Sequence, residues 1–189
     1  MNQLAQEQSD FLIDAIKKHL DSKTDYIEML AEDASHDEPW FEVEIRYVLK
    51  KMGARYVIEA SFPTTGKLPC DFLFSYFEKR NWLELKVICG KSRIADLETL
   101  KLTLRPLKPN LKRIARDFDR LVEFSDGALK WFLLILYPTP NDDLVWKSVQ
   151  QVEENAKELI ICKSLRQSLP YSLALYRVEQ VKPAEKSPA

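Results

Sequence analysis

Two acidic residues and a lysine stand at a spacing that suits the hydrolysis of phosphodiester bonds. Asp71 follows Pro69-Cys70, and Glu84-Leu85-Lys86 comes thirteen residues after Asp71. Carboxylates supply the hard oxygen ligands that Mg²⁺ prefers, and an ammonium group can steer or activate an attacking water molecule. If the chain brings these two segments together, they predict the site of a metal-dependent hydrolase.

The two segments lie in stretches that we expect to form neighbouring β-strands. Because side chains alternate between the faces of a strand, Glu84 and Lys86 share a face. Asp71 begins the preceding strand, where the two strands can diverge, so a hairpin can bring it close to Glu84. Two converging carboxylates repel each other unless a cation lies between them. The alternative is structural: an exposed Glu84–Lys86 ion pair contributes at most about 1 kcal/mol, and Asp71 is then only a strand-entry residue.

The rest of the chain predicts an α/β sandwich with a mixed sheet. Asp37-Glu38-Pro39 is typical of a helix start and Gly53 of a helix end. Residues 78–81 are expected to be a polar hairpin connection. Apolar spacing and strand alternation predict helices over residues 3–20, 24–34, 40–52, 94–104, 110–124 and 145–160, and strands over 55–62, 71–77, 82–88, 131–137 and 171–178.

Composition excludes several classes of protein. The chain has 189 residues, which suits one domain, and it contains neither GxGxxG nor GxxxxGK[ST], so it lacks the phosphate-binding turns of Rossmann and P-loop proteins. Three cysteines without a CxxC pair and two distant histidines argue against a zinc site or a disulfide framework. No signal peptide or membrane-spanning run is evident, so a cytoplasmic location is expected.

Charge is distributed unevenly although the formal net charge is only −1. Twelve acidic residues and three lysines lie between Glu7 and Glu44, whereas nine lysines and arginines and two acids lie between Lys86 and Arg116. The basic stretch directly follows Glu84-Leu85-Lys86, where a polyanion would have to be held. Its alternative explanation is a solvated face. In the helix over 110–124 the basic residues are Lys112, Arg113, Arg116 and Arg120, with Asp117 and Asp119 as possible ion-pair partners.

The stretch from Trp40 to Gly90 resembles the PD-(D/E)xK nuclease superfamily, with a motif spacing similar to that of archaeal-type Holliday-junction resolvases. The superfamily core of a helix, three strands, a helix and a strand agrees with the order predicted above. One departure is Cys70, because the family usually has the proline and aspartate adjacent. The matching residues are Glu42, Ile45, Leu49 and Gly53 on the helix, Pro69 and Asp71 at the second strand, and Glu84-Leu85-Lys86 on the third.

The resemblance implies a role for each matching residue. Asp71, Glu84 and the main-chain carbonyl of Leu85 would bind Mg²⁺, for which Mn²⁺ can substitute, and Lys86 would orient or deprotonate the attacking water. Glu42 would add a helix-borne carboxylate; Glu44, at the opposite edge of the apolar stripe, is its alternate. Without the resemblance, either glutamate is better explained as a solvated flank residue.

The resemblance also implies a restriction-endonuclease-like αβββαβ core with a mixed central sheet flanked by helices. Residues 1–38 would be an acidic N-terminal helical extension, residues 39–181 the nuclease-like domain and residues 182–189 a disordered tail. The expected function is Mg²⁺-dependent endonucleolytic hydrolysis of DNA, in preference to RNA. The nucleic-acid-binding residues would be Lys91, Arg93, Lys112, Arg113 and Arg116.

Two further hypotheses stay open at this point. The first is a non-catalytic relative that keeps the core as a nucleic-acid-binding or protein-interaction module, which the acidic N-terminal third favours. The second is a phage or mobile-element defence factor in which the acidic first 38 residues mediate assembly. In either case a homodimer or a partner protein would be contacted through that acidic region.

Overall fold

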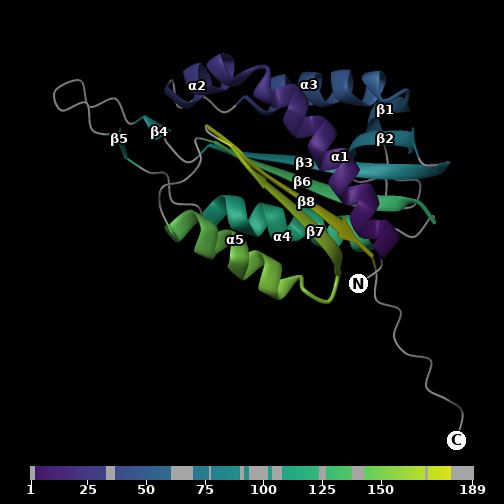
Figure 1. The fold of residues 1–189 in the computed structure, drawn as a ribbon. Coiled ribbons are helices and arrows are strands. Elements are labelled where there is room, and N and C mark those ends of the chain that lie inside the picture. Colours follow the sequence, from purple (N-terminus) through teal and green to yellow (C-terminus); the bar gives the residue numbers. More distant parts are fainter. Residues whose placement is uncertain are drawn as a thin grey trace, which may run out of the picture.

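The computed structural model places a six-stranded mixed sheet between two layers of helices (Figure 1). It describes residues 3–32, 37–60, 70–76, 78–89, 92–93, 102–103, 108–123, 127–137, 143–168 and 170–179. The predicted disordered tail over 182–189 lies outside these ranges. Within them, none of the helices combines the length and the apolar character needed to cross a membrane.

The helices and strands follow the chain in an order close to the predicted one. The helices are α1 (Gln3–Asp21), α2 (Thr24–Glu32), α3 (Glu38–Lys51), α4 (Lys108–Glu123) and α5 (Asp143–Asn155). The strands of the main sheet are β1 (Arg55–Ala60), β2 (Cys70–Tyr76), β3 (Lys79–Cys89), β6 (Leu129–Tyr137), β7 (Ile160–Gln167) and β8 (Ser172–Val178), and a separate two-stranded ribbon pairs β4 (Ser92–Arg93) with β5 (Leu102–Thr103).

The strand order is β1-β2-β3-β6-β8-β7. Strand β3 runs parallel to β6, and the other neighbouring pairs of this sheet are antiparallel. Helices α1, α2 and α3 cover one face of the sheet, and α4 and α5 cover the other (Figure 1). The predicted α/β architecture with a mixed sheet flanked by helices is therefore confirmed.

Helix α3 begins and ends where its sequence predicts. The Asp37 side chain accepts a hydrogen bond from the Trp40 backbone N–H at 3.2 Å, and Pro39 lies in the first turn, where no backbone donor is lost. Just after the helix, Gly53 has φ +75°, a left-handed conformation that favours glycine. These two ends fix which residues of α3 reach the sheet.

Strand β6 is buried on both faces, as its apolar sequence predicts. Trp131, Leu133 and Ile135 belong to the core under α1–α3, whereas Phe132 and Leu134 belong to the core under α4 and α5. The same alternation along β3 turns Leu83, Leu85 and Val87 toward α1–α3. The side chains of Glu84 and Lys86 consequently leave β3 on the α4 side of the sheet, although the Lys86 ammonium group reaches Glu38 of α3.

Three local predictions were wrong. Residues 79–81 are not a loop: Tyr76 pairs with Lys79, which leaves only residues 77 and 78 between the strands, and Glu78 takes φ 58° there. Leu102–Thr103 is a short strand rather than the end of a helix over 94–104, whose remaining residues lie outside the described ranges. The helix expected to reach residue 160 stops at Asn155, and the edge strand β7 that follows was not predicted.

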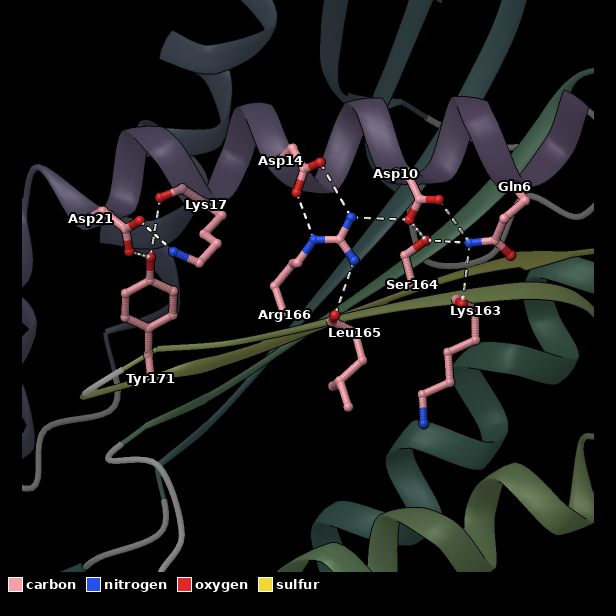
Figure 2. A network of polar contacts seen from close by, with 10 residues as sticks. All are labelled: Gln6, Asp10, Asp14, Lys17, Asp21, Lys163, Ser164, Leu165, Arg166 and Tyr171. Atoms are coloured by element: carbon pink, nitrogen blue, oxygen red, sulfur yellow. Dashed lines mark hydrogen bonds and ion pairs between the residues drawn. The ribbon is translucent and has the colours of Figure 1, made fainter.

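Helix α1 lies across β7 and β8 and is tied to them by polar contacts (Figure 2). Arg166 of β7 donates from Nε to Asp14 Oδ1 at 2.6 Å and from Nη2 to Asp10 Oδ1 at 3.1 Å. Near the end of the helix, the Tyr171 hydroxyl donates to Asp21 Oδ1 at 2.5 Å. Ile16 and its apolar neighbours on α1 belong to the same core cluster as Phe41 and Leu83. Helices α1 and α2 therefore share a hydrophobic core with the sheet.

This shared core predicts that a cavity in α1 destabilises the whole sheet. Ile16 is fully buried, so Ile16→Ala should lower the free energy of unfolding by about 2–5 kcal/mol. The measurement is urea unfolding followed by tryptophan fluorescence, because Trp40, Trp82, Trp131 and Trp146 all lie after residue 38. Leu4→Ala, at a position 59% exposed on the same helix, is the control and should change stability by less than about 0.5 kcal/mol. An unchanged transition in Ile16→Ala would mean that α1 folds independently of the sheet.

Candidate active site

The candidate site forms where β2 leaves β3. The pairing of β2 with β3 ends at Phe72 and Leu83, whereas β2 continues beside β1 as far as the Ala60–Cys70 pair. Beyond Leu83 the β2-facing edge of β3 therefore loses its strand partner. Main-chain donors on such an edge need other acceptors.

Two carboxylates accept from this edge. Asp71 Oδ2 accepts from the Leu85 backbone N–H at 2.6 Å. Glu38, in the first turn of α3, accepts from the Val87 N–H at 3.4 Å with Oε2 and from Lys86 Nζ at 3.0 Å with Oε1. Because the N–H and C=O of one residue in a strand point toward the same neighbour, the Leu85 carbonyl lies on the Asp71 side of β3.

Glu84 lies under α4 and is almost completely buried. Its Oε1 accepts a hydrogen bond from Arg120 Nη2, and Arg120 also lies 3.8 Å from Asp117 Oδ1, one turn earlier on the helix. Its other oxygen, Oε2, is buried and accepts no hydrogen bond from the described residues. The neighbouring Cys70 thiol donates to the Leu83 carbonyl at 3.2 Å, and its contact with the Glu84 side chain lowers the pKa of Glu84. A buried carboxylate oxygen without a donor is costly unless something else occupies it.

Burial is the largest cause that raises the pKa values of both carboxyl groups. Burial raises the pKa of Asp71 to about 6; the Leu85 N–H opposes the shift, whereas Glu38 and Glu42 add to it. Burial, followed by the charge of Asp71, raises the pKa of Glu84 to about 8, against the opposing effect of Arg120. Asp71 therefore lies close enough to Glu84 for its charge to affect the ionisation of Glu84.

Glu42 and Glu44 lie on different sides of α3. Burial raises the pKa of Glu42, and Glu42 in turn raises that of Asp71, so it lies on the Asp71 side of the helix. Its Oε2 accepts from Arg46 at 3.2 Å. Glu44 instead pairs with His19 of α1. The structure thus brings Glu42, and not Glu44, toward Asp71.

The predicted nucleic-acid contacts are only partly described. Lys91 lies outside the described residues, and Arg93 on β4 and Lys112 and Arg113 on α4 are described for their backbone alone. Arg116 is exposed on α4. Arg120, which the sequence grouped with this basic face, turns inward to Glu84 instead. The basic surface stays a prediction.

Sequence reasoning missed the roles of three residues at the site. Glu38 was treated only as part of a helix start, although it stands one turn before Glu42 and hence on the same face. Arg120 and Asp117 were treated as a solvated pair. A signal for their burial was available, because Asp117 falls between Ile114 and Leu121 in the apolar stripe of α4.

The carboxylates of the candidate site do not form a complete set of metal ligands by themselves. Within the described part of the chain, no group of three or more histidine, cysteine, aspartate or glutamate side chains is gathered tightly enough to hold a metal ion. What the site offers is two adjacent carboxylates, a main-chain edge and one buried oxygen without a partner. Three comparisons with known proteins, against family models, curated proteins and solved structures, gave no match to this chain.

The raised pKa values predict how stability depends on pH in the metal-free protein. Asp71 and Glu84 hold their protons more tightly in the folded state than in the unfolded chain. The free energy of unfolding should therefore fall as pH rises from about 4 to about 8. Glu84→Gln removes the larger of the two contributions, so its decline should be shallower. Urea unfolding with a chelator present at about pH 5 and about pH 8 tests this, and parallel declines in the two proteins would contradict the assignment.

Proposed function

We propose that this protein is a Mg²⁺-dependent endonuclease of the PD-(D/E)xK class that hydrolyses phosphodiester bonds of DNA. The observation that carries the proposal is the meeting of Asp71 with Glu84-Leu85-Lys86 at the point where β2 leaves β3. Asp71 lies on β2 and Glu84 on β3, so the two carboxylates come close together only in the folded protein. The proposal extends to the restriction-endonuclease-like identity of the fold.

The topology around the site supports this class. The chain runs from α3 through β1, β2 and β3, then through the short β4–β5 ribbon, to α4 and β6. Apart from that ribbon, this is the helix, three-strand, helix, strand order that the resemblance implies. Helices α3 and α4 lie on opposite faces of the sheet (Figure 1), and β6 runs parallel to β3. Both helices reach the candidate site, α3 through Glu38 and α4 through Arg120.

The chain's oxygen donors fit a hard divalent cation. Asp71, Glu84 and the Leu85 carbonyl would hold it, with Glu42 nearby on α3. The buried Glu84 Oε2 without a hydrogen bond and the repulsion between Asp71 and Glu84 are both relieved by positive charge.

The protein side chains position the reaction. When bound, the metal ion would supply Lewis-acid stabilisation and a water of lowered pKa. Lys86 is buried beside Glu38, whose carboxylate holds the ammonium group in place at 3.0 Å. From there the Lys86 ammonium group would orient the attacking water, and it could take the water's proton only after giving up its own. The bond from this water to the phosphorus would form as the bond to the departing oxygen, in line with it, breaks. Asp71 stays fixed through its bond to the Leu85 N–H.

A specific observation favours the second candidate, a non-catalytic binding module with this core. Glu84 is paired with Arg120, and Lys86 is paired with Glu38. Internal ion pairs of this kind can neutralise a site without any metal. The two candidates therefore differ in whether Asp71 and Glu84 still bind a divalent ion.

Calorimetric titration with Mn²⁺ tests the proposal. The wild-type chain should bind Mn²⁺ saturably, and Asp71→Asn should lose that binding because it removes a charged ligand while preserving the shape of the side chain. Glu44→Gln is the control, because Glu44 faces His19 on the other side of α3. Absence of Mn²⁺ binding in the wild-type protein would favour the non-catalytic module.

A further inference from the structure

A groove between α1 and α3, on the flank of α3 away from Glu42, has no role in the proposed reaction. It consists of two adjoining hollows of about 410 and 350 Å³ that share His19, Ser22 and Lys51. Volumes of this size are typical of pockets for small molecules. The first hollow is lined also by Ala15, Lys18, Val48 and Met52, and the second also by Lys23, Val43, Glu44 and Tyr47. We call this surface the α1–α3 groove.

The groove collects positive charge that no described carboxylate neutralises. Lys18 and Lys51 line the first hollow, Lys23 and Lys51 line the second, and none of the three forms an ion pair with a described residue. Among the described residues of the two linings, the only acidic one is Glu44, which is already paired with His19. Positive charges gathered in one groove attract an anion.

This charge is unexpected from the local sequence. Residues 7–44 contain twelve acids and three lysines, yet two of those lysines, Lys18 and Lys23, line the groove. Figure 2 shows where two of these acids are engaged: Asp10 and Asp14 of α1 point toward Arg166 of β7. Their carboxylates are therefore bound on the sheet side of α1, whereas Lys18 lines the groove on the α3 side.

The walls of the groove also suit a flat organic group. The rings of His19 and Tyr47 lie 4.8 Å apart at 34°, and Lys51 Nζ lies 4.8 Å from the centre of the Tyr47 ring. Val48 and Met52 add an apolar wall. Aromatic rings bind nucleobases by stacking, and lysines bind phosphate as point charges.

From these features we infer that the α1–α3 groove is a binding site for a nucleoside phosphate, with the phosphate held by Lys18, Lys23 and Lys51 and the base against Tyr47 and His19. The same chemistry is offered by a free mononucleotide and by the phosphorylated end of a nucleic-acid strand. The inference does not depend on the proposed nuclease activity, because it shares no residue with the Asp71–Glu84 site.

The test is calorimetric titration of the wild-type chain, with a chelator present, using adenosine monophosphate, inorganic phosphate and a short single-stranded oligonucleotide with or without a 5′-phosphate. Adenosine monophosphate should bind saturably and more tightly than inorganic phosphate. Tighter binding of the 5′-phosphorylated strand than of its unphosphorylated form would identify a strand end as the ligand. No response to that phosphate, with mononucleotide binding retained, would identify a free nucleotide.

Variants locate the site. Lys18→Ala combined with Lys51→Ala should weaken binding of adenosine monophosphate by roughly tenfold or more, because each lysine supplies a charge-assisted contact. Tyr47→Leu should weaken the nucleotide but not inorganic phosphate. Lys50→Ala is the matched control, since Lys50 is an exposed neighbour on α3 that lines neither hollow. Absence of saturable binding, equal affinity for inorganic phosphate, or an equal loss in Lys50→Ala would overturn the inference.

Discussion

Asp71→Asn and Glu84→Gln should each lower the rate of Mg²⁺-dependent DNA cleavage by about 10³-fold or more. Both replacements keep the size of the side chain but remove a negative charge from a site where positive charge has to be held. A bound metal ion contributes several kcal/mol of transition-state stabilisation, and about 1.4 kcal/mol corresponds to tenfold in rate. Single-turnover cleavage of a labelled DNA duplex measures the change. Branched and single-stranded DNA and RNA should be included, because the substrate structure is not known in advance.

Other substitutions separate the site from its surroundings. Lys86→Ala should lower the same rate by about 10²–10⁴-fold, the usual contribution of a group that assists proton transfer. Glu44→Gln should retain the wild-type rate, because Glu44 lies against His19. Circular dichroism and thermal unfolding show whether each variant is folded. A folded Asp71→Asn protein that cuts DNA at the wild-type rate would remove Asp71 from the reaction.

Arg120→Ala should weaken Mn²⁺ binding by about 10–100-fold, the usual effect of losing a hydrogen-bond partner of a metal ligand. Arg120 holds Glu84 Oε1, which leaves Oε2 as the oxygen available for a ligand. Arg120 is thus a positioning residue that acts through Glu84. Without it the Glu84 side chain loses its fixed orientation, and the buried carboxylate loses its nearest positive charge. Mn²⁺ titration and the cleavage rate should fall together.

The opposite result is informative because Arg120 is itself a cation beside the site. If Arg120 competed with the metal for Glu84, Arg120→Ala would bind Mn²⁺ more tightly than the wild-type chain, and the positioning role would be wrong. Arg120→Lys should recover part of the affinity, since it retains the charge but not the planar geometry of the guanidinium group. Arg116→Ala, at an exposed position one turn earlier on α4, should leave Mn²⁺ affinity unchanged.

Much of the fold is predictable because local patterns and tertiary packing agree. Asp37 and Gly53 delimit α3 through hydrogen bonding and backbone conformation, which depend on neighbouring residues alone. The alternation in β3 predicts correctly that Glu84 and Lys86 share a face. It does not reveal that this face is also covered, because the covering helix α4 comes from a distant part of the chain.

Strand β7 illustrates what the sequence hides. Its residues alternate weakly between buried and exposed positions, and its Ser164 and Arg166 side chains are bound by α1, more than a hundred residues away in the chain. Long-range pairs within the chain, such as Asp14–Arg166, leave no pattern in the sequence around either residue. Edge strands with polar faces are therefore harder to predict than a central apolar strand such as β6.

The candidate site likewise contains residues that the sequence predicted and residues that it did not. Asp71 and Glu84 were predicted to approach each other from the spacing of two strands joined by a hairpin, and their pKa values reflect that approach. The spacing of residues along the sequence does not show which residues of α3 lie beside the end of β3. Glu38 was therefore overlooked as a partner of Lys86. Arg120 was placed among solvent-facing cations for the same reason.

The most direct test of the central claim is a crystal structure of the wild-type protein grown with Mn²⁺. We expect anomalous density between the carboxylates of Asp71 and Glu84, within bonding distance of the Leu85 carbonyl. Arg120 should still donate to Glu84 Oε1. A fully ordered site that stays free of Mn²⁺ at a concentration saturating other Mn²⁺-dependent nucleases, or Mn²⁺ bound only elsewhere, would contradict it.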